Sequence, residues 1–118
     1  MDLKDKNLRE LAKILFSANY RYIDEEKTFR GKSGKVWKFD ALILDNGKFG
    51  VFIRDWKREI SITQIRQLNK ACNDIDDIEG GVMICSKSSE FSEKFGKNNG
   101  IQVLDKGLLI SKLRTQFY

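Results

Sequence analysis

The stretch that decides the fold is residues 35–57, Lys-Val-Trp-Lys-Phe-Asp-Ala-Leu-Ile-Leu-Asp-Asn-Gly-Lys-Phe-Gly-Val-Phe-Ile-Arg-Asp-Trp-Lys. Two runs rich in β-branched and aromatic residues flank Asn46-Gly47, a dipeptide typical of tight hairpin turns. The stretch therefore predicts a β-hairpin. One acid, Asp40, lies inside the first run, where strands favour apolar residues. The second run ends on charged residues at positions 54, 55, 57 and 58.

The composition bounds the classes of protein to consider. With 118 residues, 41% hydrophobic and 33% charged, the chain is expected to form one domain, residues 1–118. No apolar run approaches the ~20 residues of a membrane helix, so we expect a cytoplasmic protein with no membrane partner. The absence of His excludes Ser-His-Asp catalysis and most transition-metal chemistry. Cys72 and Cys85 are too few for a zinc site, and we expect two reduced thiols rather than a disulfide.

The positive charge is concentrated around the predicted hairpin. Residues 27–58 contain nine Lys or Arg against three acids, a net charge of +6, whereas the whole chain carries +5. A localised positive field favours a polyanionic partner, and DNA is the expected one. A solvated face on a Lys-rich protein explains the charge equally well.

Hydrophobic periodicity predicts the remaining elements. Helices are expected at residues 3–18, 61–73, 90–95 and 108–113, and strands at 20–23, 82–85 and 101–104. Residues 29–35, with two glycines and three cations, are expected to be a flexible basic connection, and residues 74–81 an acidic turn. The order α-β-β-β-α-β-α-β-α predicts an α/β fold, with a mixed central sheet of about five strands flanked by helices.

Four segments suggest a family when they are taken in order. The first helix ends at Asn19-Tyr20; Gly34-Lys-Val-Trp-Lys-Phe-Asp40 leads to a single acid; Phe52-Ile-Arg-Asp-Trp56 forms the next strand; and Gly81-Val-Met-Ile-Cys begins a tail that continues through Phe91-Ser92 and Gly100-Ile-Gln-Val-Leu-Asp105. This pattern resembles the restriction-endonuclease-like superfamily, the PD-(D/E)xK nucleases, and within it the Mrr-type domain. The resemblance spans nearly the whole chain and implies a restriction-endonuclease-like core.

The resemblance also implies a chemistry. In this family, acidic or amide oxygens hold Mg²⁺ or Mn²⁺ near the scissile phosphate, and a Lys assists the attacking water. Asp40 matches the first metal ligand. Alignment on Trp56 places Phe52 where Gln or Glu is expected, and Arg54 where Lys is expected. The family's helical Glu position falls on Leu8, so Glu10 is interpreted as a surface charge. These replacements favour a degraded site without catalysis.

Two hairpin registers remain open. A two-residue loop at Asn46-Gly47 would place Asp40 opposite Ile53 and put Asp55 and Lys57 on the Asp40 face. A displaced catalytic site would then consist of Asp40 and Asp55 as metal ligands and Lys57 as the assisting cation. A three-residue loop would instead place residues 52, 54 and 56 on that face, and Asp40 would be free to form an ion pair with Arg54.

Three functional hypotheses follow. The first is a nucleic-acid-binding domain of nuclease ancestry that needs no cofactor, with phosphate contacts from Lys32, Lys35, Arg54, Lys57 and Arg58. The second is an active Mg²⁺- or Mn²⁺-dependent endonuclease that uses the displaced site. The third is a protein-interaction subunit, for example a homodimer. Its contact would be the edge near Tyr20, Tyr22 and Phe29, or the terminus at Phe117-Tyr118.

Overall fold

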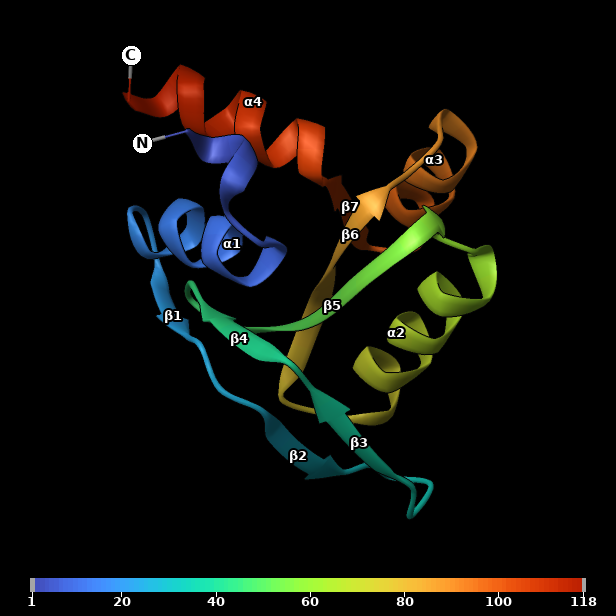
Figure 1. Ribbon diagram of the computed structural model, residues 1–118. Helices are drawn as coiled ribbons and strands as arrows, with labels where there is room; N and C mark the ends of the chain where they lie inside the picture. The colour runs from blue at the N-terminus through green and yellow to red at the C-terminus, as the bar shows by residue number, and fades with distance from the viewer. Residues whose placement is uncertain (1, 118) are drawn as a thin grey trace.

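The computed structural model describes residues 2–117, which form a five-stranded central sheet with helices on both faces (Figure 1). The strands are β1 (Arg21–Ile23), β2 (Lys27–Arg30), β3 (Val36–Phe39), β4 (Ala41–Leu44), β5 (Lys48–Glu59), β6 (Ile78–Lys87) and β7 (Ile101–Asp105). The helices are α1 (Leu8–Ser17), α2 (Ile62–Asp74), α3 (Glu90–Asn98) and α4 (Lys106–Phe117), preceded by a short 3₁₀ turn at Leu3–Asp5.

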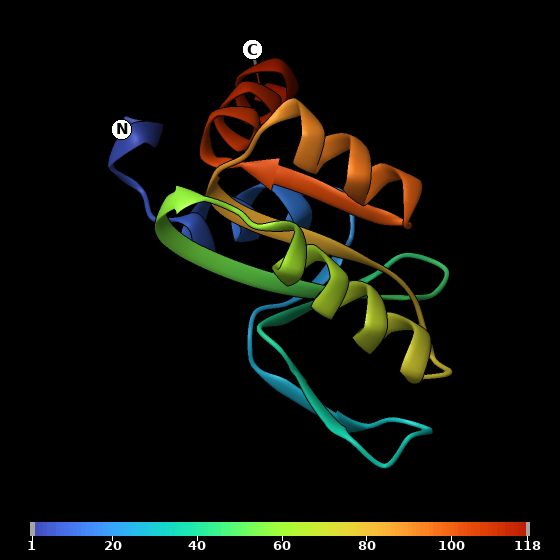
Figure 2. The same cartoon turned by 90° about the vertical axis from the view of Figure 1, so that its right-hand side faces the viewer.

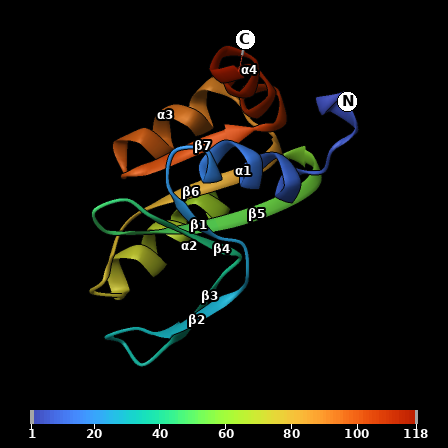
Figure 3. The same cartoon turned by 90° about the vertical axis from the view of Figure 1, so that its left-hand side faces the viewer.

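The sheet is mixed, with the strand order β1-β4-β5-β6-β7. Strand β4 runs antiparallel to both of its neighbours, β1 and β5, and β5, β6 and β7 are parallel. Helices α2 and α3 connect the parallel strands and cover one face, while α1 and α4 cover the other (Figures 2 and 3). The predicted fold class, with its mixed sheet of about five strands, is confirmed.

Local capping sets the helix boundaries. The side chain of Asn7 accepts a hydrogen bond from the backbone N–H of Glu10 at 2.8 Å, and the Glu10 carboxylate accepts one from the backbone N–H of Asn7 at 3.4 Å. This capping box starts α1 at Leu8 rather than at residue 3. Glu10 is exposed, as expected of a surface charge. Ser61 and Ser89 cap α2 and α3 in the same way, through their side-chain oxygens.

The sheet separates two hydrophobic clusters. The cluster beneath α2 and α3 contains Phe39, Phe52, Ile65, Leu68 and Met83 among its most buried members. The cluster beneath α1 and α4 is built from another set of buried residues, which includes Leu11, Val51, Ile84, Leu109 and Leu113. Because strand side chains alternate between faces, even-numbered residues of β5 point toward α2 and odd-numbered ones toward α1.

The hairpin adopts the three-residue loop. Leu44 pairs with Lys48 and Ala41 with Val51, so residues 45–47 form the turn. Asn46 has a φ of 53°, the left-handed conformation that such a loop requires and that Asn tolerates. The ring of Phe39 lies directly over Gly50, where any Cβ would collide with it. This contact fixes the register that the sequence left open, and the two-residue loop is excluded.

The region predicted as a flexible connection is ordered. Strands β2 and β3 pair through Lys27–Phe39, Thr28–Lys38, Phe29–Trp37 and Arg30–Val36. The resulting two-stranded unit, the β2–β3 ribbon, extends away from the central sheet (Figures 1 and 3). Its inner face is held by Phe29 and Trp37, which pack on the core cluster beneath α2. Burial of these aromatic rings stabilises the ribbon, although its Gly- and Lys-rich sequence indicated a flexible loop.

Strand β6 begins at Ile78, within the stretch predicted as an acidic turn. Parallel pairing with β5 extends the strand, because Phe49 and Gly50 lie opposite Gly80 and Gly81. Cys72 and Cys85 are free and buried, and burial raises the pKa of each thiol to about 12. In the described part of the chain, no helix is long and apolar enough to cross a membrane.

Candidate functional site

Asp40 lies at the bend between β3 and β4. Its backbone N–H donates to the Val51 carbonyl at 2.8 Å, and its own carbonyl accepts from Arg9 Nη1 at 3.3 Å. The side-chain atom Oδ2 accepts the backbone N–H of Ile53 at 2.8 Å. This last bond turns the carboxylate across β5, so Asp40 faces the strand that carries Phe52 and Arg54.

Arg54 completes this cluster from β5. Its Nη1 lies 3.0 Å from Asp40 Oδ2, and its Nε donates to Gln64 Oε1 of α2 at 3.1 Å. The guanidinium also lies over the Phe52 ring, with 4.4 Å between Cζ and the ring centroid. The Asp40 and Arg54 side chains are only 16% and 24% exposed, so solvent screens the pair weakly. Three independent contacts therefore hold the Arg54 charge against Asp40.

These residues do not fit a divalent cation. Oδ2 of Asp40 already accepts two hydrogen bonds, one of them from a guanidinium that would repel a metal at that position. Phe52, the neighbour of Arg54 on the same face, supplies no ligand atom. Between residues 2 and 117, no group of three or more His, Cys, Asp or Glu side chains is placed to bind a metal. Mg²⁺ is usually bound through one or two carboxylates, and the single carboxylate here is already engaged by Ile53 and Arg54.

The structure does not bring Asp40, Asp55 and Lys57 together. Asp55 lies on the opposite face of β5 from Arg54, where its Oδ1 accepts the hydroxyl of Ser86 at 2.7 Å. Lys57 is exposed near the end of the strand. The displaced Asp40–Asp55–Lys57 arrangement required the two-residue loop, and the observed register separates the two carboxylates by the thickness of the sheet.

The sequence-predicted phosphate-binding residues fall into two groups. Lys32 and Lys35 lie at the tip of the β2–β3 ribbon, and Lys57 and Arg58 lie near the end of β5. The end of β5 leads into the first turn of α2, whereas the ribbon tip is bound to Asp74, the last residue of α2. The groups are thus at opposite ends of α2 (Figure 2). Arg54 belongs to neither group because its charge is directed to Asp40.

Asp74 binds the ribbon to the C-terminal end of α2. Its carboxylate accepts the indole N–H of Trp37 at 2.8 Å and the hydroxyl and backbone N–H of Ser33 at 2.7 and 2.9 Å. These hydrogen bonds, from Trp37 first and Ser33 second, lower the pKa of Asp74 below its usual 3.8. The Asp74 main chain adds a bond, since its carbonyl accepts the N–H of Lys32 at 2.8 Å. The ribbon tip is therefore held against α2.

Two exposed cations on α2 escaped the sequence-based prediction. Arg66 and Lys70 lie one turn apart on the solvent side of the helix, between the two basic groups. Their signal was available, because the apolar residues Ile65 and Leu68 define the buried side of this helix. Both residues lie outside residues 27–58, the stretch whose net positive charge indicated a polyanionic partner.

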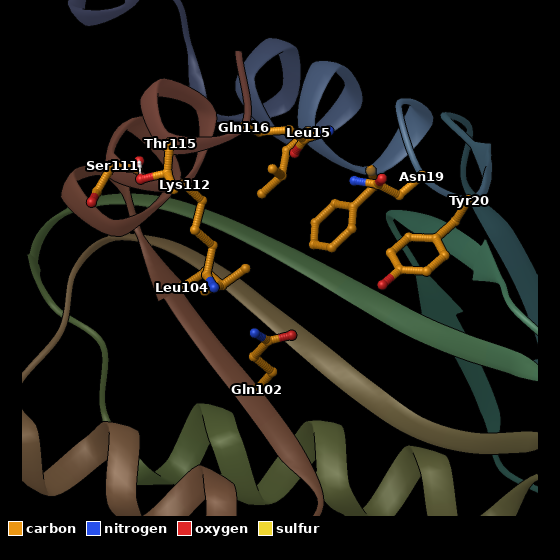
Figure 4. Close-up of a pocket in the computed structure, with 10 residues that line it drawn as sticks. Leu15, Asn19, Tyr20, Gln102, Leu104, Ser111, Lys112, Thr115 and Gln116 are labelled. Atoms are coloured by element: carbon orange, nitrogen blue, oxygen red, sulfur yellow. Dashed lines mark hydrogen bonds between the residues drawn. The ribbon is translucent and has the colours of Figure 1, made fainter. Parts of the chain in front are cut away.

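The face opposite Asp40 carries a cavity of about 460 Å³ between α1, β7 and α4 (Figure 4). Polar side chains line much of it, among them Asn19, Gln102, Ser111 and Thr115. Figure 4 shows Tyr20 and Lys112 at opposite sides of this space. Among the described residues its lining contains no carboxylate and no thiol, so it lacks the acidic metal ligands predicted around Asp40.

The predicted apolar interaction edge is only partly exposed. Tyr20 is 41% exposed, but Tyr22 stacks on Phe16 with 5.9 Å between ring centroids, and Phe29 packs against Phe39. Burial raises the pKa of Tyr22 to about 12. The other predicted contact, Phe117-Tyr118, lies outside the side chains that the structure describes.

No protein-family model and no curated protein matches the chain. Among solved structures, it is similar to AF1548, a protein of unknown function, with a TM-score of 0.70 and 10% identity over 90% of this chain. It is also similar to Can2 from Sulfobacillus thermosulfidooxidans, solved in complex with cyclic tetra-adenylate, with a TM-score of 0.60 and 15% identity over 92% of this chain.

The chain spans 64% of the length of AF1548 and 33% of the length of Can2. At these identities the likeness concerns the fold alone. The fold is a mixed α/β fold with a five-stranded mixed central sheet flanked by helices, and it is consistent with a restriction-endonuclease-like core.

Replacing Arg54 should destabilise the protein, because Asp40 is left without its ion-pair partner. In Arg54→Met the half-buried carboxylate loses its counter-charge, so we expect the free energy of unfolding to fall by about 2 kcal/mol. Adding Asp40→Asn should recover part of this loss, because the amide carries no charge. Urea titrations of the wild type, Arg54→Met and the double variant would measure both effects. Arg114→Met, at an exposed Arg of α4, is the matched control; equal losses in the two single variants would contradict the pairing.

Removing Asp74 should release the ribbon. In Asp74→Ala, backbone amides of β2 and β3 should exchange with solvent faster, while those of β5 and β6 stay protected. Because the folded pKa is lowered, the carboxylate's stabilising contribution is complete above pH 3.8 and disappears as pH falls through the lowered value. Wild-type protection should therefore persist at pH 5. Asp76→Ala, which removes only an exposed ion pair with Lys32, should leave exchange unchanged.

Proposed function

We propose that this chain is a nucleic-acid-binding domain built on a nuclease-like fold, in which an arginine–aspartate ion pair occupies the position of the metal site. The observation that carries the proposal is the Asp40–Arg54 contact of 3.0 Å. In the proposal, Asp40 and Arg54 descend from a PD-(D/E)xK motif of the Mrr type. Binding then needs neither Mg²⁺ nor Mn²⁺.

The hairpin register supports this proposal. With Leu44 opposite Lys48, the partner of Asp40 on β5 is Phe52, and Arg54 is the next residue on the same face. These are the positions at which the family resemblance expects an acid or amide and a lysine. Arginine stays protonated and forms a planar hydrogen-bonding fork, so it neutralises Asp40 permanently and cannot act as a base.

The exposed cations supply the binding energy. Lys57 and Arg58 lie near the end of β5, within the segment between Arg54 and Glu59 where the pairing with β6 shifts in register. Both are exposed, and Arg58 is steadied by the Trp56 ring, 5.1 Å from its Cζ. Contacts between such side chains and phosphates depend on charge and carry little sequence information. DNA is the expected ligand.

Neutralising the β5 cations should weaken binding in proportion to the phosphates lost. We expect Lys57→Gln/Arg58→Gln to reduce the slope of log affinity against log salt by about 1.8 for duplex DNA, because each lost contact removes about 0.9. Fluorescence anisotropy with a labelled duplex, at several NaCl concentrations in EDTA, would measure the slope. The matched control is Lys112→Gln/Arg114→Gln on α4, whose slope should equal that of the wild type.

The protein should bind without cutting. Incubation with supercoiled, linear, branched and single-stranded DNA, and with RNA, should leave each substrate intact in Mg²⁺ and in Mn²⁺. Asp40→Asn should behave identically and should bind duplex DNA as well as the wild type or better, because one negative charge is removed. Cleavage by the wild type that disappears in Asp40→Asn would contradict the proposal and restore the active endonuclease.

A further inference from the structure

The exposed side of α2 joins cations from both basic groups into one surface. Arg58 lies at the N-terminal end of the helix, Arg66 and Lys70 along it, and Lys35 beyond its C-terminal end, whereas Lys57 points to the other side of β5. We call these four residues, Arg58, Arg66, Lys70 and Lys35, the α2 face. Lys70 and Trp37 line a shared shallow hollow, and Lys35 lies over the Trp37 ring, so the helix and the ribbon tip are contiguous. Figure 2 looks onto this side of the molecule.

Aromatic rings position three of these cations. Lys35 Nζ lies 4.1 Å from the centroid of Trp37, and Arg66 Cζ lies 5.5 Å from that of Phe95. Arg58 has the same relation to Trp56 at 5.1 Å. A ring attracts a cation without neutralising it. The side chains are therefore partly ordered while their charges stay available to an anion.

Carboxylates do not neutralise the α2 face. Among residues 2–117 there are eight ion pairs, and none involves a residue of this face. Within α2 the only acid is Asp74, which stays charged but forms its hydrogen bonds with Trp37 and Ser33 and no ion pair with a cation of this face. Elsewhere, by contrast, Arg9, Lys27 and Lys48 each face an acid.

We propose that the α2 face binds the phosphate backbone of double-stranded DNA, with Arg66 and Lys70 as contacts between the two ends. This inference rests on the proposed function and specifies its ligand and its surface. The 13 residues of α2 extend over about 20 Å, which corresponds to about six base pairs of duplex. A rigid row of cations of this length matches a regular backbone.

The same face is poorly suited to single strands. Proteins that hold single strands stack the bases on exposed aromatic rings. Here Trp37 is 8% exposed, its indole N–H is bound to Asp74, and a cation lies over its ring. An exposed aromatic ring does lie nearby on α3: Phe91, one turn before Phe95, is 70% exposed. Phe91 therefore provides an internal test of the choice between duplex and single strand.

The test compares Arg66→Gln/Lys70→Gln with Lys112→Gln/Arg114→Gln, two pairs that each remove one Arg and one Lys from an exposed helix. Anisotropy would use a labelled 24-base-pair duplex and its separate strand, in EDTA. We expect the α2 variant to lose about 1.8 from the salt slope on the duplex, and the α4 variant to lose none. The wild type should bind the duplex more tightly than the strand, and Phe91→Ala should leave duplex affinity unchanged.

The outcomes separate this inference from the proposed function. If the α2 variant keeps the wild-type slope while Lys57→Gln/Arg58→Gln reduces it, Arg66 and Lys70 do not contact the duplex, the continuous α2 face is wrong, and the proposed function stands. Tighter binding of the single strand, lost in Phe91→Ala, would replace duplex backbone with stacked bases as the ligand. If the wild type binds neither form, the proposed function fails, and the inference fails with it.

Discussion

The pairing of Leu44 with Lys48 is the constraint on which the rest of the structure depends. Because strand side chains alternate, this register places Phe52 and Arg54 beside Asp40 and sends Asp55 to the other face of the sheet. A shift by one residue would reverse these assignments and turn Val51, now fully buried, toward the wrong cluster. The contact between Phe39 and Gly50 opposes such a shift, since no side chain fits at position 50.

With the register fixed, the charge of Asp40 has to be compensated in place. The backbone N–H of Ile53 and the guanidinium of Arg54 do this together, and Gln64 ties the same arginine to α2. The Asp40–Arg54 pair thus connects the sheet to a helix. At its other end, α2 is joined to the ribbon through Asp74. The helix that carries Arg66 and Lys70 is therefore anchored at both ends, which keeps its cations in a fixed arrangement.

Hydrophobic periodicity made the helices and the βαβ order predictable. The pairing of Asp40 with Arg54 was one of the two arrangements that the sequence left open. The β2–β3 ribbon was not predictable, because its stability comes from Phe29 and Trp37 packing on distant residues and from Asp74. Arg66 and Lys70 were visible as exposed helix positions, but a surface that unites them with Lys35 and Arg58 exists only after α2 has docked.

The sequence by itself determined the order of the helices and of the five central-sheet strands, the mixed α/β class and the excess of positive charge. These are properties of local pattern and residue chemistry. Only the tertiary structure decided between the two hairpin registers, because they differ by a single residue in the turn. Packing of Phe39 on Gly50 separates them, and with that choice the structure put an arginine, rather than a second carboxylate, beside Asp40.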